Sequence, residues 1–235
     1  MLNKNIIFNN KLIYKKNTLS KKIKKNFIDL KKNIYSNKIP MLNSFKKNFK
    51  LNYNKKIIKK LKNKNIYNII GMGGSILGSK TIYSFLKHKI KQNFKFIDNL
   101  DENNFSSLSK DKKQNNIFIS KSGNTIETMV NLNFIIKRKK LAKNTFVTEF
   151  KNSALLQIAN KLKSEIIEHK DYIGGRYSVM SEVGMLPAEL MNLKTKNFKN
   201  LNYLINNKNF SSSLISNVSS IYSLFLKGKK NSIIL

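Results

Sequence analysis

The sequence lacks cysteine and has only two histidines. Without cysteine, neither a disulfide nor a thiolate metal site can form. His88 and His169 lie far apart and have no neighbours of ligand type, so we expect no metal and no cofactor. No stretch reaches the ~20 apolar residues of a membrane span, and polar residues interrupt Met1 to Asn10 before a signal-peptide core can form. These absences predict a cytoplasmic protein without membrane contact.

Acidic residues are scarce, because 12 Asp and Glu stand against 46 Lys and Arg, a formal net charge of +34. Such a charge attracts nucleic acid without specificity. The lysines, however, are spread along the whole chain, and no recognition-helix pattern, aromatic RNA-binding signature or zinc-finger spacing accompanies them. We therefore prefer a solvated lysine surface, with no specific nucleic-acid partner. A basic protein that binds nucleic acid stays an alternative.

Arginine is rarer still, since Arg138 and Arg176 are the only two. Arg138 lies in a run of lysines, whereas Arg176 lies between a glycine pair and Tyr177. A planar guanidinium offers forked donors that an ammonium cannot, and such a group can stabilise an oxyanion as charge develops during a reaction. The position of Arg176 favours a functional cation, and a structural ion pair is the alternative.

Glycine is also sparse, and eight of the nine glycines fall in three short clusters. The clusters are GMGGSILG (Gly71 to Gly78), SKSGNTIET (Ser120 to Thr128) and GGRYSVMSEVG (Gly174 to Gly184). Glycine is needed where a backbone turns through positive φ or approaches a ligand closely. The clusters therefore mark three places where backbone geometry matters more than side-chain packing.

Short apolar runs alternate with helix-length segments over the middle of the chain. We expect strands at 65–70, 94–97, 116–120, 145–148 and 165–167, and helices at 75–88, 124–140 and 153–163. This alternation predicts an α/β fold, a three-layer αβα sandwich with a parallel sheet. In such sheets ligands bind at the carboxyl ends of the strands, where the first two glycine clusters lie.

The pattern divides the chain into four parts. Residues 1–62 read as N-terminal helices broken at Pro40, and 63–192 form the α/β domain. Residues 193–230 read as a helical linker with a helix at 214–227. The final NSIIL, 231–235, has the character of a strand and predicts the start of a second domain.

The second cluster predicts a phosphate site. Ser120, Ser122 and Thr125 surround Gly123 directly after an expected strand. Such a turn aims hydroxyls and backbone N–H groups at one point, and the following helix adds the partial positive charge of its N-terminus. The alternative is a plain capping box that starts at Thr125.

The first cluster offers a backbone that a ligand can approach. Gly73 and Gly74 carry no side chain there, and Ser75 can donate a hydroxyl. The run is not a Walker loop, because no Gly-Lys-Ser/Thr follows, and it does not match dinucleotide spacing. A close-packed turn without a ligand is the alternative.

The three clusters, in this order and at these separations, resemble the N-terminal part of the glucose-6-phosphate isomerase (phosphoglucose isomerase) family, which has the flavodoxin-like sugar-isomerase (SIS) fold. The resemblance covers about residues 60–190 and rests most on DYIGGRYSVMSEVG, Asp171 to Gly184, although Glu182 replaces a small residue or proline. It implies aldose–ketose isomerisation of glucose 6-phosphate and fructose 6-phosphate in glycolysis and gluconeogenesis. It also implies a homodimer.

The resemblance assigns roles to eight residues. The 6-phosphate would be bound by Ser120, Ser122, Thr125 and the Lys121 main chain. The sugar phosphate would be bordered by Gly74 and Ser75, and C1 and C2 would lie at Gly175 and Arg176. Arg176 would stabilise a cis-enediolate. The family's general base, with a histidine and a lysine for ring opening, lies in the second half of the polypeptide, and its motifs are absent from this sequence. A non-catalytic sugar-phosphate-binding SIS domain is therefore an alternative, and we interpret His169 as an exposed loop residue.

Overall fold

Five parallel strands form one sheet in a computed structural model, which describes residues 18–62, 66–101, 114–138, 143–199 and 202–229. The strands are β1 Ile66–Gly71, β2 Asn93–Ile97, β3 Gln114–Ile119, β4 Lys143–Thr148 and β5 Glu165–Glu168. Their order across the sheet is β2-β1-β3-β4-β5. All five expected strands are confirmed, with ends that differ by a few residues at most. A fully parallel sheet explains their near-continuous apolar runs, because both faces are covered.

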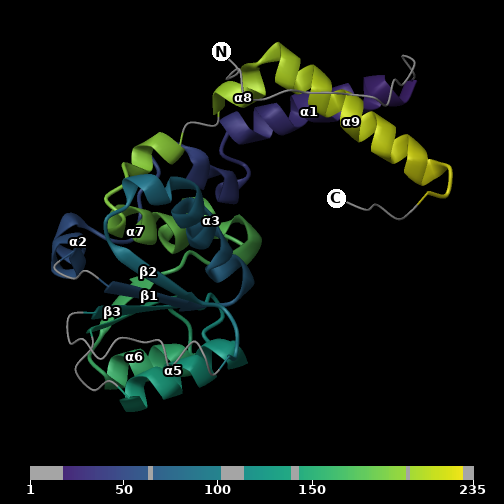
Figure 1. Cartoon of the computed structure of the whole chain (residues 1–235). Helices are drawn as coiled ribbons and strands as arrows, with labels where there is room; N and C mark the ends of the chain where they lie inside the picture. The colour runs from purple at the N-terminus through teal and green to yellow at the C-terminus, as the bar shows by residue number, and fades with distance from the viewer. Residues whose placement is uncertain (1–17, 63–65, 102–113, 139–142, 200–201, 230–235) are drawn as a thin grey trace. The chain divides into compact units, whose positions relative to one another are not determined.

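Helices cover the two faces of this sheet (Figure 1). On one face lie α5 Ile126–Arg138 and α6 Ala154–Lys161, and on the other lie α3 Leu77–Leu86 and α7 Glu182–Leu190. The short helix α2, Lys55–Lys62, packs on the α7 side through Ile58 and Leu61. This arrangement confirms the three-layer αβα sandwich.

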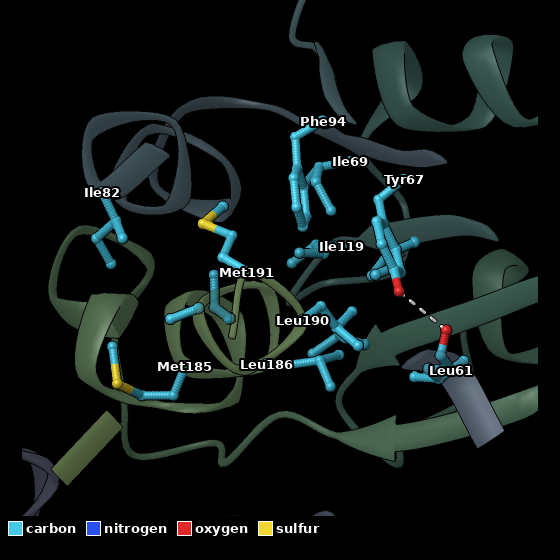
Figure 2. Packing of buried hydrophobic residues seen from close by; sticks show 14 of the residues in the cluster. Leu61, Tyr67, Ile69, Ile82, Phe94, Ile119, Met185, Leu186, Leu190 and Met191 are labelled. Atoms are coloured by element: carbon cyan, nitrogen blue, oxygen red, sulfur yellow. Dashed lines mark hydrogen bonds between the residues drawn. The ribbon is translucent and has the colours of Figure 1, made fainter. Parts of the chain in front are cut away.

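Successive side chains of each strand point to opposite faces of the sheet and pack into two separate hydrophobic cores. Ile69 and Ile119 point to the α7 side, where they meet Leu186 and Leu190 (Figure 2). On this face the buried hydroxyl of Tyr67 donates a hydrogen bond to the carbonyl oxygen of Leu61 at 3.1 Å, which fixes the end of α2 over β1. The sheet is therefore bound to α2 and α7 by both apolar contact and a polar anchor.

The opposite face has the smaller core. Ile70, Phe118 and Phe146 point toward α5 and α6, and the two phenylalanine rings stack with centroids 5.2 Å apart. Leu132 and Leu155 close this core from the two helices. Burying a side chain of this size contributes roughly 1.5–3 kcal/mol, so each strand is held from both sides.

Short 3-10 helices make several of the connections. They are η1 Pro40–Phe45, η2 Gly73–Ser75, η3 Lys87–Lys89, η4 Gly175–Met180 and η5 Thr195–Phe198. Two of them, η2 and η4, fall inside the first and third glycine clusters. In each of these clusters a tight turn thus precedes the start of a regular helix, α3 at Leu77 and α7 at Glu182.

By its contacts the chain divides into two units, Met1–Lys46 with Asn200–Leu235, and Lys47–Lys199. In the first unit α1 Thr18–Tyr35 lies beside α9 Lys208–Leu226, and α8 Asn202–Asn206 precedes α9. The Tyr35 hydroxyl donates to the Asn206 side-chain oxygen at 2.9 Å.

The four-part division expected from the sequence stays a prediction, and its boundaries at 62 and 192 do not coincide with those of the two units. The expected strand at 231–235 lies outside the described residues. Among the described helices, none is long and apolar enough to cross a membrane.

Candidate functional site

The carboxyl ends of neighbouring strands meet at one edge of the sheet. Gly71 at the end of β1 is in register with Ile119 at the end of β3. The chain leaves β1 for β2 on one side, and β3 lies on the other side of β1. The order 2-1-3-4-5 places a topological switch point between β1 and β3, which is where open α/β sheets bind ligands. The first and second glycine clusters follow these two strands.

The loop after β3, Ser120–Thr125, is held closed by hydrogen bonds of its own hydroxyls, and we call it the hydroxyl loop. The Ser120 and Thr125 hydroxyls lie 3.0 Å apart, and the Ser120 hydroxyl also accepts the Gly123 N–H at 3.2 Å. Gly123 has φ +69, and a side chain there would also strike Ser153. Glycine is therefore required at this position. The loop leads directly into α5, which begins at Ile126 immediately after Thr125.

The turn after β1, which contains η2, packs directly against η4, Gly175–Met180. Because η4 contains Arg176, we call it the arginine turn. A methyl group added at Gly74 would lie 2.2 Å from the carbonyl oxygen of Gly175 and 3.0 Å from the backbone nitrogen of Arg176. The Ser178 hydroxyl donates to the Gly175 carbonyl oxygen at 2.7 Å and lies 3.2 Å from that of Gly74. Two segments about a hundred residues apart thus share one backbone contact.

The arginine turn carries exposed side chains on a fixed backbone. Arg176 and Tyr177 are exposed, whereas Ser178 is buried. The turn is anchored by a hydrogen bond from the Tyr177 N–H to the Gly174 carbonyl oxygen at 2.9 Å. An exposed guanidinium on a rigid turn is available to an anionic ligand, and no ion-pair partner of Arg176 is found in the described part of the chain.

The structure therefore brings two groups of predicted residues into contact and places the third on the adjacent strand. Gly74 meets the backbone of Gly175 and Arg176 directly, and η2, which ends at Ser75, packs against η4. Ser120, Lys121, Ser122 and Thr125 follow β3, whose last residue pairs with the last residue of β1. These assignments to a ligand remain predictions.

One expectation from the sequence is wrong. His169 is not an exposed loop residue, because its side chain is only 1% exposed at the end of β5. Its backbone N–H donates to the Thr148 carbonyl oxygen at 2.8 Å, which continues the β4–β5 pairing by one residue and pulls the ring inward. Burial lowers the pKa of the imidazole, although the Lys170 carbonyl oxygen, 3.0 Å from Nδ1, opposes the shift.

An ion cluster beside the loop Ser120–Thr125 was not predicted from the sequence. The Lys121 ammonium lies 3.3 Å from the Glu149 carboxylate, and Lys151 binds the other oxygen of that carboxylate. Burial raises the pKa of Glu149, but the hydrogen bonds from Lys151 and Lys121 outweigh it and lower that pKa below its ordinary value. Charge pairs at such separations in sequence leave no local pattern.

A second polar cluster lies under the N-terminus of α7, and we name it the α7 cluster. It comprises Asn52, Tyr53, Lys170, Glu182 and Lys199. Oε1 of the fully buried Glu182 accepts the Asn52 N–H at 2.8 Å and lies 3.5 Å from the Lys170 ammonium. Within the described ranges, the buried Oε2 of Glu182 and Nζ of Lys199 have no hydrogen-bond partner.

Lys199 is shielded by an aromatic ring rather than paired. Its ammonium lies 4.7 Å from the centre of the Phe49 ring, and the Lys170 ammonium lies 5.4 Å from the same centre. Burial lowers the pKa of Lys199 to about 8, against the attraction of Glu182 and Glu189. Burial likewise raises the pKa of Tyr53. Over the residues that the structure describes, no three histidine, aspartate or glutamate side chains gather as metal ligands.

The chain was compared with protein families and with known proteins. The family model described as phosphoglucose isomerase matches residues 14–224. A glucose-6-phosphate isomerase of Borreliella burgdorferi is 39% identical over 132 residues, which cover 49% of this chain and 24% of that protein. One from Methanocaldococcus jannaschii is 42% identical over 127 residues, 51% of this chain and 31% of that protein.

The chain thus spans only a quarter to a third of the length of these relatives. Among solved structures, a hypothetical protein of Thermus thermophilus superposes with a TM-score of 0.65 over 88% of this chain and 54% of its own, at 18% identity, so it supports the fold alone. The family model covers most of the chain, including all three glycine clusters. On this evidence the chain belongs to the phosphoglucose isomerase family.

Proposed function

We propose that this chain binds a sugar phosphate at the carboxyl edge of its sheet and supplies the arginine of an aldose–ketose isomerase that interconverts glucose 6-phosphate and fructose 6-phosphate. The observation that carries the proposal is the backbone contact of Gly74 with Gly175 and Arg176. It holds the arginine turn against the turn after β1, next to the strand that leads into the hydroxyl loop.

The two ends of the substrate need different chemistry. A phosphate monoester suits neutral donors at a helix N-terminus, which the loop of Ser120, Ser122 and Thr125 provides before α5. The sugar end develops negative charge when a proton moves between C1 and C2 through an enediolate. A guanidinium that is not already paired can stabilise that charge, and Arg176 is exposed on its turn.

The proton transfer itself needs a general base within hydrogen-bond reach of C1 and C2. Among the described acids, Glu182 is fully buried at the start of α7 and Glu149 is held by two lysines, so neither is available for this role. The proposal therefore assigns binding and charge stabilisation to these residues and leaves the base unassigned. A non-catalytic sugar-phosphate binder is the second candidate, and the same observation supports it.

The test is calorimetric titration of the purified chain with glucose 6-phosphate and with glucose, alongside a coupled assay of fructose 6-phosphate isomerisation. We expect binding of the phosphorylated sugar only. Turnover would support the isomerase. Because no base is assigned in this chain, binding without turnover fits both candidates, and the Arg176 variant then decides between them. Equal affinity for glucose and glucose 6-phosphate would contradict both.

Arg176→Lys sharpens the test. Because lysine keeps the charge but loses the fork, we expect phosphate binding to change less than about threefold, while an enediolate-like inhibitor such as a hydroxamate of a phosphorylated sugar acid loses about 100-fold in affinity, as for other lost oxyanion donors. Unchanged inhibitor affinity would remove the role of Arg176. The family relationship also supports a homodimer in the cytoplasm, which native mass and cell fractionation would test.

A further inference from the structure

The Lys121 side chain joins three segments that the proposed site requires. Its ammonium donates to the carbonyl oxygen of Asp171 at 2.6 Å and pairs with the Glu149 carboxylate at 3.3 Å. Lys121 belongs to the loop after β3, Glu149 follows β4, and Asp171 begins the segment that leads into the arginine turn. One side chain therefore bridges the hydroxyl loop and the arginine turn.

Both ends of this bridge are fixed. At the loop end, the Lys121 carbonyl oxygen accepts the Glu149 N–H at 3.2 Å, and the preceding Ser120 is buried. At the turn end, the Ile173 N–H donates to the Lys170 carbonyl oxygen at 3.2 Å, which closes a turn around Asp171, and Ile173 is fully buried. A shift of the loop backbone is therefore passed to Asp171 rather than absorbed by a loose end.

The hydrogen bond to Asp171, more than the pairing with Glu149, accounts for the position of the Lys121 ammonium. Glu149 is only 7% exposed and is already bound by Lys151. It does not need Lys121 for neutralisation alone, and the shortest contact of the Lys121 ammonium is with the Asp171 carbonyl oxygen. A charge-assisted hydrogen bond of this kind contributes enough to bias a turn that carries exposed side chains.

We infer that Lys121 is a positioning residue: its ammonium couples occupation of the hydroxyl loop by a phosphate group to the position of the Arg176 turn, without contacting the phosphate. The main-chain role predicted for Lys121 is separate from this one. The inference deepens the proposed function and rests on it.

Inorganic phosphate is the sharpest probe, because it can fill the hydroxyl loop but cannot reach the arginine turn as a sugar phosphate would. Backbone amide NMR shifts of the whole chain are followed during a phosphate titration. In the wild type we expect shifts at Ser122 and Gly123 in the loop and also at Gly174, Gly175 and Arg176 in the turn. In Lys121→Met the loop shifts should persist, while the turn shifts fall by more than about half, as expected when a bond that couples two sites is removed.

Lys151→Met is the matched control. It removes the other lysine from the same carboxylate but leaves the Lys121–Asp171 hydrogen bond, so the turn shifts should stay as in the wild type. Lys121→Arg keeps a cation of similar reach and should restore at least part of the coupling. If Lys121→Met lowers the melting temperature, Lys121→Arg still shows whether a cation at this position restores the turn shifts.

Ligand affinities give a second readout. In Lys121→Met the affinity for inorganic phosphate should change less than about threefold, whereas that for glucose 6-phosphate should fall about tenfold, or about 1.4 kcal/mol. Turn shifts that persist in Lys121→Met, or that vanish equally in Lys151→Met, would overturn the coupling and leave the proposed function intact. Loss of all phosphate binding in Lys121→Met would overturn it too, by showing direct contact. A wild type without loop shifts would overturn the proposed function itself.

Discussion

The carboxyl edge of the sheet and the α7 cluster are both rich in polar groups, yet they use them in opposite ways. At the carboxyl edge the hydroxyls of Ser120 and Thr125 bond each other, and Arg176 faces solvent. In the α7 cluster, Glu182 and Lys199 are buried, and one polar atom of each lacks a partner among the described residues. The first region can exchange its internal bonds for a ligand at low cost, whereas the second holds charges that are costly to disturb.

The comparison teaches that nearness of charged groups does not by itself mark a site. What distinguishes the carboxyl edge is backbone geometry: at Gly74 two segments distant in sequence meet without room for a Cβ, and the loop glycine Gly123 has a positive φ. Mutations at the edge should therefore damage binding more than stability, and mutations in the α7 cluster should do the reverse.

The largest effect on ligand binding is expected from Gly74→Ala. The new methyl group would lie 2.2 Å from the Gly175 carbonyl oxygen, so the turn after β1 and the arginine turn must separate. A displacement of this order can cost about 100-fold in function, and we expect a loss of that size in glucose 6-phosphate affinity by calorimetry. Gly174→Ala is the control, because its methyl group would meet only Tyr177 at an ordinary 3.5 Å. Equal losses in both variants would break the argument from backbone contact.

A large effect on stability is expected from Glu182→Ala. It leaves the Lys170 ammonium and the Asn52 N–H without their buried carboxylate, and removing one partner of a buried pair costs about 3–5 kcal/mol. Urea unfolding followed by circular dichroism measures this loss. Glu168→Ala, at an exposed carboxylate that also contacts Asn52, should cost less than about 1 kcal/mol. A Glu182→Ala variant as stable as the wild type would show that the α7 cluster is not a charged cluster in solution.

A more gradual effect on stability is a dependence on pH from Lys199. Its pKa in the folded protein is about 8, below the ordinary 10.5. Between these values the unfolded chain binds more protons than the folded one, so the free energy of unfolding should rise with pH across this interval. The full rise is roughly 3 kcal/mol. It is measured as the difference between wild type and Lys199→Met, because subtracting the variant removes the titration of other lysines and tyrosines. A difference that stays flat from about pH 8 to 10 would mean that Lys199 is charged and paired.

Most of the sheet could be predicted from the sequence, because a buried parallel strand leaves a local signal. The run at 65–70 is apolar, ends at a glycine and forms β1, and the same reasoning locates the other four strands. Helix α7 could not be predicted in this way. Its residues are buried on almost every side and include Pro187, so they carry no amphipathic period.

The candidate site divides in the same way. The turns could be predicted from the glycine clusters. Their meeting at one edge of the sheet could be predicted because ligand-binding turns of a parallel sheet lie at the carboxyl ends of its strands. The burial of His169 and the ion pairs of Lys121 and Glu182 could not be predicted, because each depends on contacts with residues outside any short sequence motif.

α9 begins six residues earlier than expected, where Asn207 accepts the Phe210 N–H as an N-cap.

The strand order also has a consequence for how the chain reaches its native state. β1 and β3 are neighbours in the middle of the sheet, but β2 lies between them in sequence and pairs at the edge. A ribosome that adds about 5–20 residues per second needs roughly 2–10 s after completing β1 before it completes β3. During that interval the apolar strand waits without its central partner. We expect closure of this long loop to slow the folding of the domain, and conditions that slow translation between the two strands should lower its yield.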